Sequence, residues 1–220
     1  MRQTIATFLV LLLLLAVAGS GLAGGQRVFR DYFESLPRFW RQVYPDGGET
    51  LYCGDRFPPH KDRRYNVEHV YPMSWVARAE RCGRRDDCRR SSPRFNRIEA
   101  DMHNFYPSRK DINKIRSSFP FGMVRGEERE YGRCDFEFDP RTRRVEPRPE
   151  VRGNIARAMF YMHDAYGLRI YRRQADLLKR WNREDPPDAE ERLRNDRIER
   201  VQGNRNRFID DPRAAEKLRF

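Results

Sequence analysis

The residues best suited to chemistry in this chain are an adjacent carboxylate and imidazole, Glu68 and His69, in the segment "YNVEHVYP". A carboxylate oxygen is a ligand that Mg²⁺ prefers, and a neutral imidazole suits general-base work near neutral pH. Neighbouring side chains of a regular strand point to opposite faces, so a shared site predicts a bulge or an irregular strand end between them. These residues alone are equally consistent with a surface pair on a strand.

Motifs and charge limit which other chemistry is open to the chain. It has no HExxH, G-x-S-x-G or Walker sequence, which argues against a metalloprotease, a serine hydrolase and a P-loop enzyme. It carries 45 Lys and Arg residues against 33 Asp and Glu residues, a formal net charge of +12. That sign favours phosphate polymers or anionic surfaces as partners. Because nearly all the bases are Arg, the composition of a GC-rich genome explains the excess equally well.

The N-terminus predicts export. A single Arg precedes an apolar run from Ile5 to Val17, and small residues follow around Ala23. This pattern is typical of a secretory signal peptide, here residues 1–23, and the run is short for a membrane span. We therefore expect a periplasmic or secreted protein with no stable membrane association after cleavage. An uncleaved N-terminal anchor is the alternative.

The four cysteines of an exported chain are expected to pair. Four cysteines allow three connectivities. Cys82 and Cys88 bracket the short loop "CGRRDDC" and would close on each other most easily, which leaves Cys53 with Cys134. A zinc site is disfavoured because the chain has neither a C-x2-C nor a C-x4-C spacing.

Short helices and strands must position the Glu68–His69 pair. Helical spacing of apolar residues predicts helices within residues 27–48, interrupted at Pro37, and over 74–82, 95–107, 108–119, 150–168 and 172–185. Strands are predicted at 49–53, at 67–72 and at 134–138, the last leading into a hairpin. The mixture indicates an α+β protein.

The apolar residues predict one core followed by a charged tail. Large apolar residues are concentrated between Tyr32 and Leu178, and the sequence after Trp181 is charged. We expect a core domain over residues 24–180 and a charged C-terminal extension, residues 181–220, that packs on it or trails from it.

Five segments, taken in order, resemble a known family. They read "VEHVYPMSW", "CGRRDDC", "FNRIEADMHNFYPSRKDINKIRSSF", "YGRCDFEFDPRTRRVEPRPEVRGNIARAMFYM" and "RNDRIERVQGNRNRFID". In this order they resemble the bacterial endonuclease I family of exported nucleases, within the His-Me finger (ββα-metal) superfamily. The resemblance implies a ββα-metal core with short strands surrounded by several helices, and makes residues 24–180 the nuclease domain. The chain departs from the family in reading "YCGD" where many members read YCGC.

The resemblance assigns a role to each residue of the core motif. It implies that His69 is the general base and that Glu68 and Asn113 are the two protein ligands of one divalent ion. It also implies that Arg85 contacts the cleaved phosphate. Asn104 precedes Asn113 by nine positions, the spacing at which related HNH enzymes hold an Asn that orients the base.

Two more positions match the family near the site. Glu99 matches an acidic position there, and Arg116 matches an arginine expected to contact phosphate. The loop between Cys82 and Cys88, which contains Arg85, is shorter than in related sequences.

The resemblance implies an exported, sequence-non-specific endonuclease that hydrolyses phosphodiester bonds of DNA to 5′-phosphate ends. The implied cofactor is Mg²⁺ or another divalent cation such as Ca²⁺ or Mn²⁺. We expect a monomer acting on double-stranded DNA, with single-stranded DNA and RNA left open as substrates. The alternative is a catalytically silent, Arg-rich secreted protein that binds nucleic acid.

Overall fold

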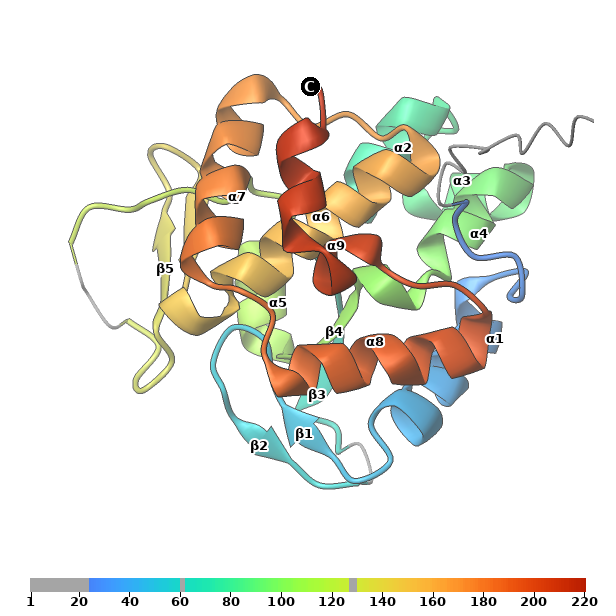
Figure 1. The fold of residues 1–220 in the computed structure, drawn as a ribbon, viewed down its shortest axis with the longest axis horizontal. Coiled ribbons are helices and arrows are strands. Elements are labelled where there is room, and N and C mark those ends of the chain that lie inside the picture. The colour runs from blue at the N-terminus through green and yellow to red at the C-terminus, as the bar shows by residue number, and fades with distance from the viewer. Residues whose placement is uncertain (1–23, 60–61, 127–129) are drawn as a thin grey trace, which may run out of the picture.

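A computed structural model describes residues 24–59, 62–126 and 130–220. The predicted signal peptide, residues 1–23, lies outside the described residues. Within these ranges the chain forms a mostly helical structure with three two-stranded antiparallel sheets, which confirms the α+β class (Figure 1). None of the helices in the described ranges is long and apolar enough to cross a membrane.

The helices and strands follow one another in short pieces. The α-helices are α1 (Tyr32–Arg38), α2 (Met73–Glu80), α3 (Arg85–Ser91), α4 (Pro93–Glu99), α5 (Lys110–Arg116), α6 (Arg152–Tyr166), α7 (Arg172–Glu184), α8 (Ala189–Gln202) and α9 (Arg207–Asp210). The strands are β1 (Gly48–Glu49), β2 (Arg56–Phe57), β3 (Tyr65–His69), β4 (Phe105–Arg109), β5 (Phe136–Asp139) and β6 (Arg144–Pro147). A π-helical turn η1 (Phe39–Val43) continues α1, and three 3₁₀ turns are η2 (Met102–Asn104), η3 (Pro149–Val151) and η4 (Pro212–Lys217).

The central unit for function is β3, β4 and α5. Strand β3 pairs antiparallel with β4, and α5 begins at the residue that follows β4. Sequence patterns predicted two helices over residues 95–119, so the prediction missed β4. Pro107, read as a helix break, lies in β4 opposite Val67, and its carbonyl accepts a hydrogen bond from Leu51. Long-range pairing with β3 therefore overrides the local helical spacing.

Other predicted elements agree or differ in detail. The interrupted first helix is confirmed by α1 and η1, and the hairpin after residue 134 by β5 and β6. Helices α6 and α7 are confirmed as well. The strand predicted at 49–53 shrinks to β1, because the chain turns at Leu51–Cys53. Helix α3 was not predicted; it is held to α2 by a disulfide.

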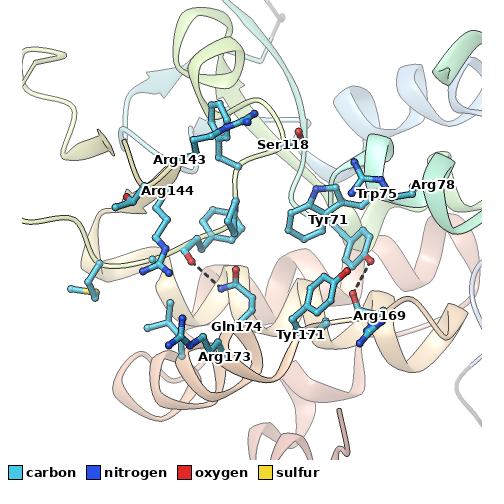
Figure 2. A pocket seen from close by; sticks show the side chains of 18 of the residues that line it. Tyr71, Trp75, Arg78, Ser118, Arg143, Arg144, Arg169, Tyr171, Arg173 and Gln174 are labelled. Carbon is cyan, nitrogen blue, oxygen red and sulfur yellow. Dashed lines mark hydrogen bonds between the residues drawn. The ribbon is translucent and has the colours of Figure 1, made fainter. Parts of the chain in front are cut away.

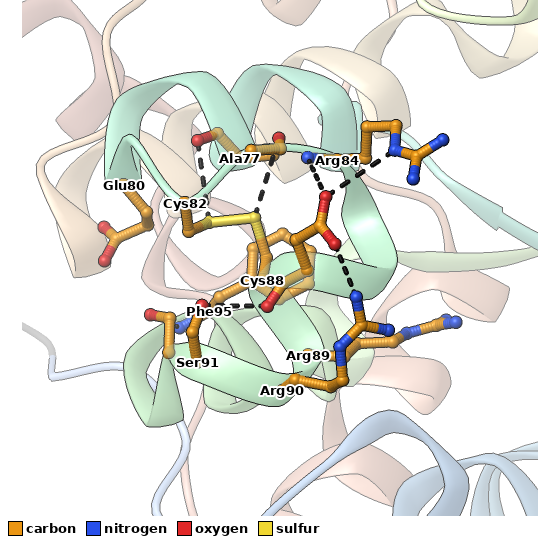
Figure 3. Close-up of a disulfide and its surroundings, with 12 residues drawn as sticks. Ala77, Glu80, Cys82, Arg84, Cys88, Arg89, Arg90, Ser91 and Phe95 are labelled. Carbon is orange, nitrogen blue, oxygen red and sulfur yellow. Dashed lines mark hydrogen bonds and ion pairs between the residues drawn. A yellow bond between two sulfur atoms is a disulfide. The ribbon is translucent and has the colours of Figure 1, made fainter.

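Both predicted disulfides are present. Cys82, just after α2, is bonded to Cys88 in α3, as Figure 3 shows, and Cys53 is bonded to Cys134. The first bond fixes a helix that begins at Arg85. The second ties the loop after β1 to the start of the β5–β6 hairpin across 81 residues of sequence.

Helix α6 lies in the middle of the fold. Its Ile155, Met159 and Met162 are buried, as their spacing predicted, and α7 and α9 pack against it (Figure 1). The segment predicted as a charged extension also contributes to the core, through the buried side chains of Ile198 and Phe208. The boundary expected after residue 180 falls inside α7.

A buried ion pair attaches α8 to α6. The guanidinium of Arg157 forms paired hydrogen bonds with both carboxylate oxygens of Glu191, and neither side chain is exposed. Arg157 also donates to Asn182 and to the carbonyl of Asp185. Removing one partner of such a pair leaves the other charge buried without compensation.

Glu191→Ala should therefore lower the free energy of unfolding by about 3–5 kcal/mol, because Arg157 loses its counter-charge in the core. Urea unfolding followed by circular dichroism measures the change. Glu216→Ala is the matched control, since Glu216 pairs with Arg183 at the surface and should contribute no more than about 1 kcal/mol. Equal destabilisation by the two substitutions would contradict the expected role of the buried pair.

Candidate active site

Four of the residues predicted to act together line one cavity. Glu68, His69, Arg85 and Asn113 surround a space of about 750 Å³ between the end of β3, the start of α3 and helix α5. They come from segments separated by as many as 45 residues of sequence. The β3–β4 pairing and the α2–α3 disulfide bring these segments together.

The predicted irregularity between Glu68 and His69 is wrong. Strand β3 stays in register with β4 through both residues, with Glu68 opposite Tyr106 and His69 opposite Phe105. The two side chains accordingly have different neighbours. They still reach one cavity because His69 is the last residue of β3, so the site lies at the end of the strand rather than on one face.

Glu68 is buried and held by two neighbours at a single oxygen. Its Oε1 accepts a hydrogen bond of 2.7 Å from the Tyr52 hydroxyl and lies 3.1 Å from the Arg116 Nε. Burial raises the pKa of Glu68, while the Arg116 charge and the Tyr52 hydrogen bond oppose that shift. Within the described chain Oε2 has no hydrogen-bond partner, so one carboxylate oxygen remains for a ligand.

His69 is buried and held in a defined protonation state. Its Nε2 lies 3.0 Å from the backbone carbonyl of Glu99. A carbonyl only accepts hydrogen bonds, so Nε2 carries the proton and Nδ1 the lone pair. Burial, assisted by the charge of Arg85, lowers the pKa of His69 to about 3. The imidazole is therefore neutral at physiological pH and can accept a proton at Nδ1.

Asn113 reaches the cavity from α5. Its side-chain amide donates from Nδ2 to the Val67 carbonyl and to Asn66 Oδ1, at 3.1 and 3.0 Å. These bonds orient the amide and leave Oδ1 without a partner in the described part of the chain. Asn113 thus presents an oxygen from α5 beside the strand that carries Glu68.

The donor set fits a hard divalent cation. Carboxylate and amide oxygens are ligands of Mg²⁺ and Ca²⁺, and Mg²⁺ keeps several waters when few protein ligands are present. Among the described residues no group of three His, Cys, Asp or Glu side chains could hold a metal ion. A site built from Glu68 Oε2 and Asn113 Oδ1 therefore suits a partly hydrated cation rather than zinc.

Glu99 connects His69 with two arginines. Its buried carboxylate accepts hydrogen bonds from Arg85 and from Arg89, with the Arg89 Nε 2.9 Å from Oε2. Both arginines are on α3 and line the cavity. Glu99, the acidic position predicted near the site, therefore orients two guanidinium groups at the cavity wall.

Two predicted roles do not match the geometry. Asn104 does not contact His69; its side chain bonds the backbone N–H and carbonyl of Tyr71, two residues further on. The Glu99 carbonyl orients the imidazole instead. Arg116 is fully buried and donates to the Val70 carbonyl as well as pairing with Glu68. Its burial argues against the predicted phosphate contact and makes it a support for Glu68.

Sequence reasoning missed Arg89 and Tyr52. Arg89 follows Arg85 by four positions, which is one helical turn, so the pair would have pointed to a shared face had α3 been predicted. Tyr52 precedes Glu68 by 16 residues and lies in a turn, so no local pattern indicates that it contacts Glu68.

Comparison with known proteins places the chain among nucleases. An extracellular deoxyribonuclease of Aeromonas hydrophila is 40% identical over 151 residues, which cover 67% of this chain and 65% of that protein. A periplasmic deoxyribonuclease of the same species is 38% identical over 202 residues, 81% of this chain and 85% of that protein. An extracellular ribonuclease of Bacillus amyloliquefaciens is 31% identical over 136 residues, 54% of this chain and 46% of that protein.

The family comparison covers most of the chain. The model of the family described as Endonuclease I matches residues 41–213. The matched range includes all four residues that were predicted to act together and that line the cavity. It also includes α8 and most of the segment after residue 180, so the family resemblance extends beyond the β3–β4–α5 unit. This confirms the resemblance found in the sequence, and the chain belongs to the Endonuclease I family.

Proposed function

We propose that the protein is an exported endonuclease that hydrolyses the phosphodiester bonds of DNA without sequence preference, using one divalent cation and leaving 5′-phosphate ends. The observation that carries the proposal is the meeting of His69, Glu68, Asn113 and Arg85 in one cavity. Membership of the Endonuclease I family and the names of the deoxyribonuclease relatives support it. In this proposal β3, β4 and α5 form the ββα-metal unit that the family resemblance implies.

His69 acts as the general base. A phosphodiester is an anion that repels nucleophiles, so the attacking water must lose a proton as it approaches phosphorus. The Glu99 carbonyl keeps the proton of His69 on Nε2, and Nδ1 accepts the proton of the water. A low pKa in the free protein keeps the imidazole in this neutral form.

Glu68 and Asn113 hold the cation. When bound, a Mg²⁺ ion supplies positive charge beside the phosphoryl oxygens and the leaving 3′ oxygen. Tyr52 and Arg116 keep Glu68 Oε1 occupied and orient Oε2, while Val67 and Asn66 orient the Asn113 amide. Groups of this kind around a metal ligand fix its geometry before the metal binds.

Arg85 stabilises negative charge on the phosphate. Its guanidinium is anchored at Nε by Glu99, and 43% of the side chain is exposed, so its other donors are accessible from the cavity. Charge-assisted bonds of this type strengthen as negative charge develops in the transition state. Arg89 shares the Glu99 carboxylate and adds a second positive charge to the same wall.

Basic side chains around the cavity give a binding surface for duplex DNA. Arg84, Lys110 and Lys114 line the cavity in addition to Arg85 and Arg89. Contacts of Arg and Lys with backbone phosphates carry no sequence information and make affinity strongly dependent on salt. Cleavage without sequence preference follows from binding of this kind.

Export agrees with the proposed activity. A nuclease outside the cytoplasm is separated from the genome of its own cell, and disulfides form in that compartment. The names of the extracellular and periplasmic relatives support this location. RNA remains a second candidate substrate because some relatives are named extracellular ribonucleases.

Purified protein should nick supercoiled plasmid in the presence of Mg²⁺ and lose this activity in EDTA. His69→Ala should cleave about 10²- to 10⁴-fold more slowly, because the attacking water loses its base, while DNA binding is retained. Gel analysis of plasmid and a filter-binding assay measure the two properties. Unchanged cleavage by His69→Ala would remove His69 from the mechanism, and binding without any nicking would favour a silent nucleic-acid-binding protein.

Tyr52→Phe should weaken Mg²⁺ binding about 10- to 100-fold, because Glu68 loses a hydrogen bond that orients it. Isothermal titration calorimetry of the protein without DNA measures the affinity. Tyr71→Phe removes a hydroxyl that donates to the Arg169 carbonyl away from Glu68, and it should leave the affinity unchanged. If both variants bound Mg²⁺ like the unaltered protein, Tyr52 would not support the cation site.

Arg85→Ala should lower kcat about 10²- to 10³-fold, the effect of removing one charge-stabilising donor from an active site. Single-turnover cleavage of a labelled duplex measures the rate. Arg90→Ala is the matched control on α3, because Arg90 pairs with Asp87 and does not line the cavity (Figure 3). The same rate loss in both variants would point to a general loss of positive charge rather than to a role for Arg85.

A further inference from the structure

A second cavity, of about 920 Å³, opens next to the candidate active site. Figure 2 shows Tyr71, Trp75 and Tyr171 along one side, Arg143 and Arg144 along the other, and Gln174 between them. The volume is near the upper end of the range of about 300–1,000 Å³ that binding sites for small ligands span. We call this cavity the aromatic groove.

The arginines of the aromatic groove have no acidic partners among the described residues. Six exposed arginines line it, and none forms an ion pair in the part of the chain that the structure describes. They are Arg78, Arg143, Arg144, Arg169, Arg173 and Arg180. Several other arginines of the protein are paired with carboxylates, as Arg205 is with Asp210. Positive charge left unpaired along a groove favours an extended anionic ligand.

Flat aromatic faces lie between these charges. The rings of Tyr71 and Trp75 meet edge to face with centroids 5.5 Å apart; Tyr71 is buried, Trp75 is half-buried and Tyr171 is 64% exposed. The guanidinium of Arg169 lies 4.5 Å from the centroid of the Tyr171 ring, and Arg143 lies 5.1 Å from that of Phe119. Exposed rings interleaved with arginines are the features by which proteins bind single-stranded nucleic acid, because bases stack on the rings and phosphates pair with the cations.

The aromatic groove adjoins the candidate active site. Ser118 lines both cavities, and Tyr71 follows His69 by two residues. The hydrogen bonds of Asn104 to the backbone of Tyr71 hold this connection in place. A strand whose phosphate lies beside His69 could therefore extend directly into the groove.

We propose that the aromatic groove binds a segment of unpaired DNA strand adjacent to the phosphate that is cleaved. Bases stack against Trp75 and Tyr171, and the flanking phosphates pair with the groove arginines. In a duplex the faces of the bases are covered by their neighbours, so exposed rings give no advantage there. This inference rests on the proposed function for the choice of DNA as the ligand, and it adds a preference for unpaired segments.

Binding of a fluorescein-labelled oligothymidylate in EDTA, followed by fluorescence anisotropy, tests the groove without requiring cleavage. Tyr171→Ala should weaken binding about 5- to 160-fold, the typical cost of losing one stacked base. Tyr171→Phe keeps the ring and should bind like the unaltered protein. A labelled hairpin duplex should show a much smaller effect of Tyr171→Ala. Because Tyr171 is mostly exposed, both variants are expected to fold.

The proposed phosphate contacts of the groove arginines are tested by two substitutions of neighbouring arginines on α7. Arg173 lines the groove and its neighbour Arg172 does not, although both are exposed. Arg173→Ala should reduce the dependence of oligothymidylate affinity on salt by about one ion, since one phosphate contact is lost. Arg172→Ala should leave the salt dependence of the affinity like that of the unaltered protein.

Two outcomes would overturn the inference. If Tyr171→Ala bound oligothymidylate as tightly as the unaltered protein, no base would stack in the groove. If it lost as much affinity for the duplex as for the single strand, the preference for unpaired DNA would be wrong. Normal plasmid cleavage together with either result leaves the proposed nuclease function intact. Binding that depends on Tyr171 in a protein that never cleaves DNA would instead overturn the nuclease function and keep the groove.

Discussion

The arrangement of the candidate site depends on one buried residue, Glu99. Its backbone carbonyl accepts the hydrogen bond of His69, and its carboxylate accepts those of Arg85 and Arg89. Glu99 is 1% exposed, and burying an unpaired carboxylate costs folding free energy. The two guanidinium groups supply the positive charge that offsets this cost. Because the carbonyl and the carboxylate belong to one residue at the end of α4, Glu99 fixes the positions of His69, Arg85 and Arg89 relative to one another.

Glu68 and Asn113 are held in place by helix α5 rather than by Glu99. Arg116, buried at the end of α5, pairs with Glu68 and donates to the Val70 carbonyl just after β3. Asn113 on the same helix bonds the Val67 carbonyl within β3. Helix α5 thus fixes Glu68 and Asn113 against one strand, and Glu99 fixes His69 at the end of that strand. The cavity lies between these two supports, which explains how adjacent residues of a regular strand contribute to a single site.

Much of the site, but less of the fold, could be predicted from the sequence. The identities of Glu68, His69, Asn113 and Arg85 came from the ordered motifs, and they line one cavity. Strand β4 was missed because local spacing was helical, whereas its pairing with β3 is a long-range interaction. The contact of Tyr52 with Glu68, like the Asn104 side-chain bonds to Tyr71, joins segments that are distant in sequence, so no local pattern reports it.

The balance of charge in the candidate site bears on how the proposed substrate and cation would share it. Glu68 is offset by Arg116, whereas one carboxylate, Glu99, is shared by Arg85 and Arg89. Arg89 also pairs with Asp86, so two carboxylates balance the two arginines, and Lys110 and Lys114 carry the remaining positive charge at the cavity wall. Under the proposed function this charge would attract a phosphate without a cation, since it comes from the chain itself. A cation held by Glu68 and Asn113 would then contribute to the chemical step more than to binding.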